Sequence, residues 1–301
     1  MPAEPTRYQS AEEDSGRWSD FPFRQGDIVI STRSKSGTTW LQMICALLIF
    51  QQPRPPAPLP ELSPWLDWRI RSRGEVYAQL ERQPHRRFIK THTPLDGLPL
   101  DDRATYIVGA RDPRDMYVSL YHQGENIDRE VVGRLLGHAT PSDHPASVGQ
   151  QKRSDVRHAL LGWIDGGATP QEQMDSIRGV MWHLTDAWQR RHKPNIVLVH
   201  YSDLLRDLEG EMHRLADILA IKVPEETWSA LVDAAVFEQM REHAGRLVPS
   251  GDTGVLKDVH AFFRTGASGA WRHLLTDKDV ARYEQRVASL APPDLLDWLH
   301  R

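Results

Sequence analysis

One short segment, Lys35-Ser36-Gly37-Thr38-Thr39, combines a cation, hydroxyls and a glycine where a strand gives way to a helix. Backbone N–H groups at the start of a helix bind oxyanions, and the helix dipole favours negative charge there. Lys35 adds a positive charge, the hydroxyls add donors, and Gly37 lets the backbone approach a ligand closely. The segment predicts a phosphate or sulfate site; an ordinary Ser/Thr helix cap is the structural alternative.

This segment differs from the P-loop of ATP- and GTP-binding proteins, whose pattern is G-x-x-x-x-G-K-[ST]. Lys35 comes before Gly37, and Thr32 stands where the first glycine of that pattern would be. The predicted strand at 105–110 runs into Arg111 rather than into a carboxylate that could hold Mg²⁺. These differences oppose a P-loop kinase and indicate a second anion instead.

Two further segments could hold that second anion. Arg111 follows a predicted strand and Ser119 lies two turns into the next helix, so both could meet one phosphate. Near the end of the chain, 264–272 combines arginines with glycine, alanine and serine, a composition suited to wrapping backbone around a ligand.

The elements that must position these residues alternate between strand and helix. Apolar runs predict buried strands at 27–31, 87–91, 105–110 and 195–201. Helical segments follow, at 40–50, at 113–121 and through residue 219. This alternation predicts an α/β fold, with a central parallel sheet flanked by helices and a P-loop-like strand, loop and helix at its start.

The segment at 124–175 interrupts this rhythm. It is rich in Gly, His, Asp and Ser, and its apolar residues are irregularly spaced. It predicts a long insertion that acts as a lid, with a surface excursion of no function as the alternative. No internal repeat is visible, so one domain is expected over residues 1–301.

Composition and charge exclude several classes of protein. The 37 Lys and Arg against 41 Asp and Glu give a net charge of −4, without the basic excess of nucleic-acid or anionic-membrane binders. The longest apolar run, Met43–Phe50, is too short for membrane insertion. An acidic N-terminal stretch and a single cysteine, Cys45, favour the reducing cytoplasm.

Together these motifs resemble the cytosolic sulfotransferase family, which transfers a sulfuryl group from 3′-phosphoadenosine 5′-phosphosulfate (PAPS). Residues 35–40 resemble the family's 5′-phosphosulfate loop, and 90–92 resemble its catalytic strand. Arg111 with Ser119 resembles its 3′-phosphate motif, and 264–271 is similar to its C-terminal cofactor loop. The resemblance implies the sulfotransferase fold and PAPS as cofactor.

The resemblance also implies a set of site residues. The catalytic residues would be Lys35, Lys90 and His92. The cofactor-binding residues would be Thr32, Lys35, Ser36, Gly37, Thr38, Thr39, Trp40, Arg111, Ser119, Tyr201, Phe237, Arg264, Thr265 and Gly266. The acceptor pocket would be an aromatic wall of Phe21, Phe23, Trp65 and Trp68, for which core packing is the alternative.

Sulfuryl transfer needs a base, a stabilised leaving group and in-line geometry. With an ordinary pKa near 6.5, His92 is largely neutral at cytoplasmic pH and can take the acceptor's proton. Lys90, on the same strand face, would lie beside the transferring group, and Lys35 would stabilise the leaving phosphate. This scheme requires no metal, and zinc motifs are absent from the sequence.

The sequence departs from the family's pattern at several positions. Thr265 replaces a lysine, which weakens the hold on the 3′-phosphate unless Arg272 or Lys257 takes its place. Ala235 lacks a hydroxyl that would contact adenine. The family's dimer motif is not recognisable at 256–263, so homodimer formation is left open.

The predicted function is therefore in-line sulfuryl transfer from PAPS to a hydroxyl of a small-molecule acceptor, a phenol or an alcohol. Two alternatives remain at this point. One is a P-loop-type nucleotide kinase, and the other is a non-catalytic protein that binds adenosine bisphosphate.

Overall fold

The computed structural model describes residues 4–137, 155–249 and 253–301. In these residues a parallel sheet with strand order β2-β1-β3-β4 forms the centre of the molecule. Its strands are β1 (Ile28–Thr32), β2 (Phe88–Thr91), β3 (Thr105–Ala110) and β4 (Ile196–His200). The predicted strands are confirmed, and their ends shift by at most one residue.

Helices of several lengths surround the sheet. The longer ones are α1 (Thr38–Phe50), α3 (Arg73–Arg82), α4 (Pro113–Asn126), α6 (Val156–Ile164), α7 (Ile177–Arg190), α9 (Leu208–Ile218), α10 (Trp228–Ala235) and α13 (Asp277–Ala288). The shorter ones are α2 (Leu59–Leu62), α5 (Arg129–Leu135), α8 (Tyr201–Arg206), α11 (Phe237–Glu242), α12 (Ala244–Leu247) and α14 (Pro293–Leu299). Single 3₁₀ turns lie at η1 (Ser15–Trp18), η2 (Leu95–Gly97), η4 (Glu225–Thr227), η5 (His260–Phe262) and η6 (Ala270–His273).

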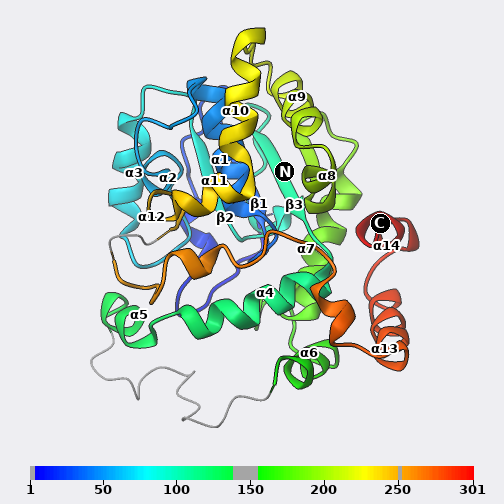
Figure 1. Cartoon of the computed structure of the whole chain (residues 1–301). Helices are drawn as coiled ribbons and strands as arrows, with labels where there is room; N and C mark the ends of the chain where they lie inside the picture. Colours follow the sequence, from blue (N-terminus) through cyan, green and yellow to red (C-terminus); the bar gives the residue numbers. More distant parts are fainter. Residues whose placement is uncertain (1–3, 138–154, 250–252) are drawn as a thin grey trace.

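Both faces of the sheet are covered, as the sequence predicts for parallel strands. On one face, Ile28 and Ile30 pack with α1, α9 and α10, and α1 lies between the sheet and α10 (Figure 1). On the other face, Val29 packs with α3, α7 and the N-terminal aromatics. Alternate residues of β1 therefore enter two different clusters, so the strand is apolar on both sides.

The carboxyl ends of the strands form one edge of the sheet. In the ladder Ser31 pairs with Thr91, Thr32 with Gly109, and Ala110 with His200. The loops that follow β1, β2, β3 and β4 therefore leave side by side. This is the edge at which open α/β sheets bind ligands.

A buried ion pair fixes the opposite edge of the sheet. Arg87 donates from Nε to Asp27 Oδ1 at 2.8 Å and from Nη2 to Oδ2, and both side chains are 2% exposed. Arg24 N also donates to Asp27 Oδ2, at 2.8 Å. The backbone of the same two residues starts the ladder, because Ile28 N donates to Arg87 O at 2.9 Å.

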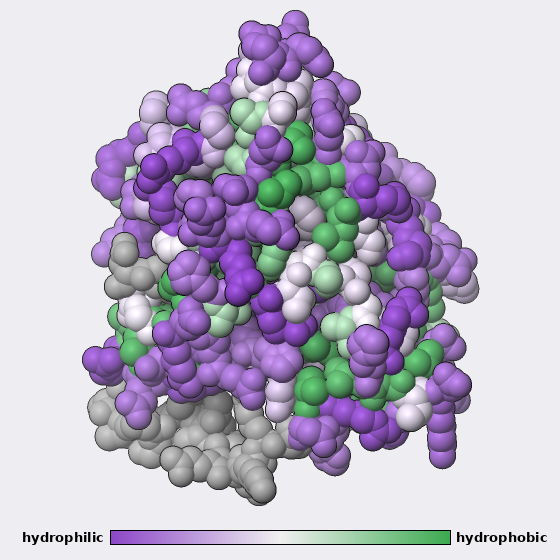
Figure 2. All heavy atoms as spheres, viewed as in Figure 1, coloured by the Kyte–Doolittle hydropathy of each residue, from purple (hydrophilic) through white to green (hydrophobic). Residues whose placement is uncertain are grey.

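The region predicted as an insertion is partly helical. The end of α4, α5 and α6 fall inside 124–175, and the role of this region as a lid stays a prediction. Residues 138–154 lie outside the described part of the chain. The face shown in Figure 2 is mainly hydrophilic, with apolar residues in smaller groups. Within the described ranges, no helix is long and apolar enough to cross a membrane.

Candidate functional site

The loop between β1 and α1 turns through two left-handed residues. Lys35 has a φ of 62° and Gly37 a φ of 93°. Gly37 is also the N-cap of α1, and a Cβ there would lie 3.1 Å from the Tyr201 ring. Only glycine combines this backbone with so close a neighbour. The loop thus brings a lysine to a helix start, whose first N–H groups have no partners within the helix.

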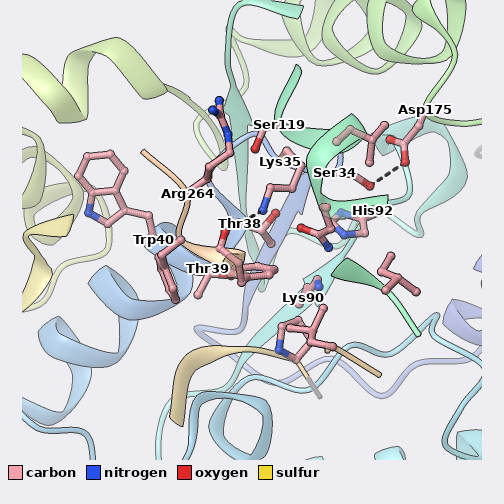
Figure 3. Close-up of a pocket in the computed structure, with 18 of the residues that line it drawn as sticks. Ser34, Lys35, Thr38, Thr39, Trp40, Lys90, His92, Ser119, Asp175 and Arg264 are labelled. Atoms are coloured by element: carbon pink, nitrogen blue, oxygen red, sulfur yellow. Dashed lines mark hydrogen bonds between the residues drawn. The ribbon is translucent and has the colours of Figure 1, made fainter. Parts of the chain in front are cut away.

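A cavity borders this loop and most of the residues predicted for the site. The predicted residues that line it are Lys35, Gly37, Thr38, Thr39, Trp40, Trp65, Trp68, Lys90, His92, Arg111, Ser119, Tyr201, Phe237, Arg264, Thr265 and Gly266. Figure 3 shows how side chains from β2, α1, α4 and the C-terminal segment surround one space. Segments far apart in the sequence therefore converge as expected.

Thr32 and Ser36 are buried beneath the loop and do not line the cavity. The Thr32 hydroxyl hydrogen-bonds the hydroxyl of Thr38, at the first position of α1. Its carbonyl oxygen lies 2.6 Å from His92 Nδ1. Thr32 thus positions two residues that do line the cavity.

That contact determines the proton arrangement on His92. A carbonyl oxygen only accepts, so Nδ1 carries the hydrogen and a neutral ring keeps its lone pair on Nε2. Burial, followed by the nearby Lys90 and Arg33 cations, holds the pKa of His92 well below its ordinary value. His92 is therefore a neutral imidazole at pH 7, with Nε2 available as a proton acceptor.

Lys35 and Lys90 line the cavity, and both have lowered pKa values. Burial and the neighbouring Arg111, Lys90 and Arg264 lower the pKa of Lys35 to about 7. Its Nζ lies 3.9 Å from the centre of the Phe262 ring. Burial lowers the pKa of Lys90 to about 8, and its Nζ lies 3.7 Å from the centre of the Trp65 ring. An anion in the cavity would favour the charged form of both.

Two arginines keep unused donors at the cavity. Arg111 donates from Nη1 to Lys35 O at 3.1 Å and from Nη2 to Ala267 O at 2.8 Å. The buried Nε atoms of Arg111 and Arg264 find no hydrogen-bond partner among the described residues. Buried guanidinium N–H groups without acceptors fit an anionic ligand such as a phosphate.

The C-terminal loop is fastened against α4. Besides the contact to Ala267, Gly269 N donates to Asp115 Oδ2 at 2.6 Å. Gly266 has a φ of 62°, and a Cβ there would lie 2.4 Å from the Phe237 ring. The loop therefore packs its backbone directly on an aromatic face. The predicted compensating cations, Arg272 and Lys257, do not line the cavity.

The remaining aromatic residues lie at one end of α1. Trp40 meets Tyr201 edge to face with centroids 5.3 Å apart. Its Nε1 donates to Ala235 O at 2.9 Å, which fixes the indole ring. Trp40, Tyr201 and Phe237 all line the cavity, and aromatic faces suit a purine.

Comparison with known families identifies the group to which this geometry belongs. The family model described as "Sulfotransferase domain" matches residues 25–291. This chain belongs to the sulfotransferase family. It is 40% identical to a "Glycolipid sulfotransferase" of Mycobacterium bovis, over 97% of this chain and 93% of that protein. It is 26% identical to "Sulfotransferase 1A1" of Rattus norvegicus, over 92% of this chain and 88% of that protein.

Solved structures that contain PAP share the fold. Retinol dehydratase in complex with androsterone and the inactive cofactor PAP superposes with a TM-score of 0.67 at 22% identity, covering 93% of this chain and 86% of that one. A mouse sulfotransferase complexed with PAP gives a TM-score of 0.64 at 19% identity, covering 91% and 87%. The predicted sulfotransferase fold is confirmed.

Only half of the predicted aromatic wall borders the cavity of this sulfotransferase. Trp65 and Trp68 line it and stack with centroids 4.9 Å apart, and Trp65 meets His92 edge to face at 4.7 Å. Phe21 and Phe23 are not among the lining residues. They are 6% exposed and pack with Trp18 in the core beneath the sheet, so their predicted place at the acceptor pocket is wrong.

A buried network that no sequence motif indicates lies behind His92. Arg33 is 2% exposed, and its Nη1 donates to His92 O. Its Nη2 donates to Asp175 Oδ1 at 2.7 Å, and Ser34 Oγ donates to Asp175 Oδ2 at 2.7 Å. Figure 3 shows the Ser34 contact. The position of Arg33 directly before the segment 34–39 could have indicated a role at the site. Its partner Asp175 is too distant in the sequence to be inferred.

Acidic side chains were also missed. Glu12, Glu13 and Asp175 line the cavity. Glu13 lies before the first strand in an acidic run, and no motif around it indicates a place at the site. Within the described ranges, no group of three His, Cys, Asp or Glu side chains could hold a metal ion.

Proposed function

We propose that this sulfotransferase transfers a sulfuryl group from PAPS to a hydroxyl of a glycolipid. The observation that carries the proposal is the hydrogen bond from His92 Nδ1 to Thr32 O, which leaves Nε2 as a base inside a cation-lined cavity. PAPS supplies a sulfuryl group on a phosphate that can leave. This chain's own residues bind that donor, orient the acceptor and remove its proton.

The cofactor-binding residues fall into three groups. Lys35, Thr38 and Thr39 would hold the 5′ end at the start of α1. Arg111, Ser119 and Arg264 would hold the 3′-phosphate, supported by the unpartnered Nε atoms of both arginines. Trp40, with Tyr201 and Phe237, would contact the adenine. Retinol dehydratase and the mouse sulfotransferase, which share this fold, both hold PAP in their solved structures.

His92 Nε2 would accept the proton of the attacking hydroxyl. Its low pKa keeps the lone pair free at neutral pH, at the cost of lower basicity. Lys90 lies over the Trp65 ring next to His92 and would neutralise charge on the transferring group. Lys35, in the phosphate loop, would stabilise the oxygen that leaves.

A glycolipid acceptor agrees with both the relatives and the cavity lining. The relatives at 40% identity carry the name glycolipid sulfotransferase. The cavity includes apolar side chains from the end of α4, from α5 and from the segment after 253: Ile127, Val132, Val255 and Leu256. Such a surface suits an alkyl chain, whereas the Trp65–Trp68 pair suits a ring. The segment 124–137 would then border the acceptor, in keeping with the predicted lid.

A cytoplasmic location stays a prediction. Cys45 is fully buried, and burial raises the pKa of its thiol to about 12, so it is an inert structural thiol. Homodimer formation is likewise open.

The test is transfer of labelled sulfate from PAPS to a panel of an alkyl glycoside, an alcohol and a phenol. We expect transfer by the wild type, and a fall of about 10²–10⁴ in kcat for His92→Ala because general-base assistance is lost. His192→Ala, at an exposed histidine, is the matched control and should keep the wild-type rate.

Equal rates for wild type and His92→Ala would contradict the base role. Absence of transfer by the wild type to every hydroxyl, with tight binding of adenosine 3′,5′-bisphosphate, would support the non-catalytic alternative.

A further inference from the structure

Backbone contacts between residues 12–14 and residues 67–69 hold Glu13 at the cavity. It forms an antiparallel bridge with Trp68. On either side, Arg69 N donates to Glu12 O at 2.8 Å and Asp14 N donates to Asp67 O at 2.9 Å. The N-terminal segment therefore behaves as a short added strand, and its side chain at 13 borders the same cavity as Trp65, Trp68 and His92.

The Glu13 carboxyl has an unsatisfied atom. Its Oε2 is buried and finds no hydrogen-bond partner among the described residues. The nearby cations are otherwise engaged, since Arg33 bonds Asp175 and His92 O, and Lys90 lies over Trp65. A buried carboxyl oxygen without a partner is costly, so a ligand that supplies a donor is favoured there.

The charge state of Glu13 suits a neutral hydroxyl. Burial, with the carboxylates of Asp67 and Asp175, raises the pKa of Glu13 to about 8, although Arg33 and Lys90 oppose the shift. Near neutral pH the carboxyl is therefore largely protonated and can both donate and accept. It also adds little repulsion toward an anionic donor in the same cavity.

We propose that Glu13 is a specificity-determining residue that hydrogen-bonds a second hydroxyl of a sugar acceptor, next to the hydroxyl that His92 deprotonates. The inference rests on the proposed function. A phenol or simple alcohol has one hydroxyl, which is used at His92, and so leaves Glu13 Oε2 unpaired. A site built around a buried polar group discriminates against ligands that lack its partner. Trp68, which stacks on Trp65 and lines the cavity, adds an aromatic surface beside the sugar ring.

The test compares two acceptors of equal alkyl length, octyl β-glucopyranoside and octan-1-ol, with PAPS as donor. We expect the wild type to prefer the glucoside in kcat/KM. Glu13→Ala should lower kcat/KM for the glucoside about tenfold and leave that for octanol within about twofold. Glu13→Gln, which keeps both hydrogen-bonding functions, should restore much of the preference. Glu81→Gln, at an exposed position on α3, is the control.

Several results would overturn the proposal. One is an equal fall on both acceptors in Glu13→Ala, and another is a wild type that prefers octanol. If Glu13→Ala fails to fold, as judged by its melting temperature and its binding of adenosine 3′,5′-bisphosphate, the Glu13→Gln ratio decides. If the wild type transfers sulfate to neither acceptor nor to a phenol, the result contradicts the proposed function rather than the role of Glu13.

Discussion

Burial lowers the pKa values of both Lys35 and Lys90, and for Lys35 the cations of Arg111, Lys90 and Arg264 at the same cavity add to the shift. A polyanion reverses this environment, because it favours the protonated form of each lysine. Binding of the nucleotide must therefore take up protons whenever the free protein has lost them.

This linkage gives a pH dependence with a defined sign. The pKa of Lys35 is about 7 in the free protein, so above pH 7 binding must first protonate it. We expect the affinity for adenosine 3′,5′-bisphosphate to fall as pH rises from 7 to 9, approaching tenfold per pH unit for each proton taken up. Calorimetry in buffers of different ionisation enthalpy measures this uptake.

Lys35→Arg is the matched control for this prediction. Arginine stays charged across the range, so the variant should show a flatter profile than the wild type. An affinity for the wild type that does not change between pH 7 and pH 9 would contradict the linkage.

At the residue scale, the sequence revealed residues whose local neighbours carry the signal. Lys35 and Gly37 are identified by the serines and threonines around them in the sequence. His92 is identified by Lys90, which lies two residues earlier on the predicted strand. Glu13 and Asp175 have no such local pattern. They reach the cavity only through an N-terminal bridge and a distant arginine, contacts that depend on tertiary packing.

At the element scale, the Asp27–Arg87 pair joins the starts of β1 and β2. Removing one partner of a buried pair leaves the other charge uncompensated. We expect Asp27→Ala to lower the free energy of unfolding by about 3–5 kcal/mol. Denaturant unfolding followed by circular dichroism measures the change.

Asp165→Ala is the control, because Asp165 pairs with Arg282 at the surface, where their side chains are 44% and 52% exposed. Its loss should change stability by about 1 kcal/mol or less. Comparable losses in the two variants would show that burial of the Asp27 pair has no special effect.

Strands were predicted more accurately than their surroundings for a physical reason. A central parallel strand is apolar on both faces, so β1 and β3 stand out in the sequence. α5 and α6 are short, with one buried residue in α5 and three in α6, so neither forms a long apolar pattern. Phe21 and Phe23 were wrongly assigned to the acceptor pocket because the sequence does not distinguish an aromatic residue of the core from one that lines a pocket.

At the scale of the whole molecule, a chain of net charge −4 places four cationic side chains around one cavity. Lys35, Lys90, Arg111 and Arg264 all line the cavity, and each of the other three lowers the pKa of Lys35. Their mutual repulsion destabilises the free protein and is relieved by a bound polyanion. That residues from Glu13 to Gly266 share this cavity is consistent with the predicted single domain, which stays a prediction.

Because the cations repel one another in the free protein and attract the ligand, replacing Lys35 should change the stability of the free protein and the stabilisation by ligand in opposite directions. Lys35→Ala should raise the melting temperature of the free protein, because one of the repelling charges is gone. It should also shrink the rise on adding adenosine 3′,5′-bisphosphate, which for the wild type at about a hundredfold excess over Kd corresponds to about 2.7 kcal/mol. Differential scanning fluorimetry with and without the ligand measures both.

The exposed Lys222→Ala variant should match the wild type in both measurements. A lower melting temperature of free Lys35→Ala would indicate that the lysine stabilises the fold through its contacts with Phe262 instead.

The strand order β2-β1-β3-β4 has a consequence for how such a protein can diversify. Because successive connections leave β1 and β3 toward opposite sides, the crevice between them exists whatever the loops contain. In the proposed arrangement, the donor half of the cavity is built mainly on these strand ends, while the acceptor half comes from the N-terminal segment, residues 65–68 and α5. Exchange of those peripheral segments could re-target the enzyme to another acceptor while leaving the donor chemistry intact.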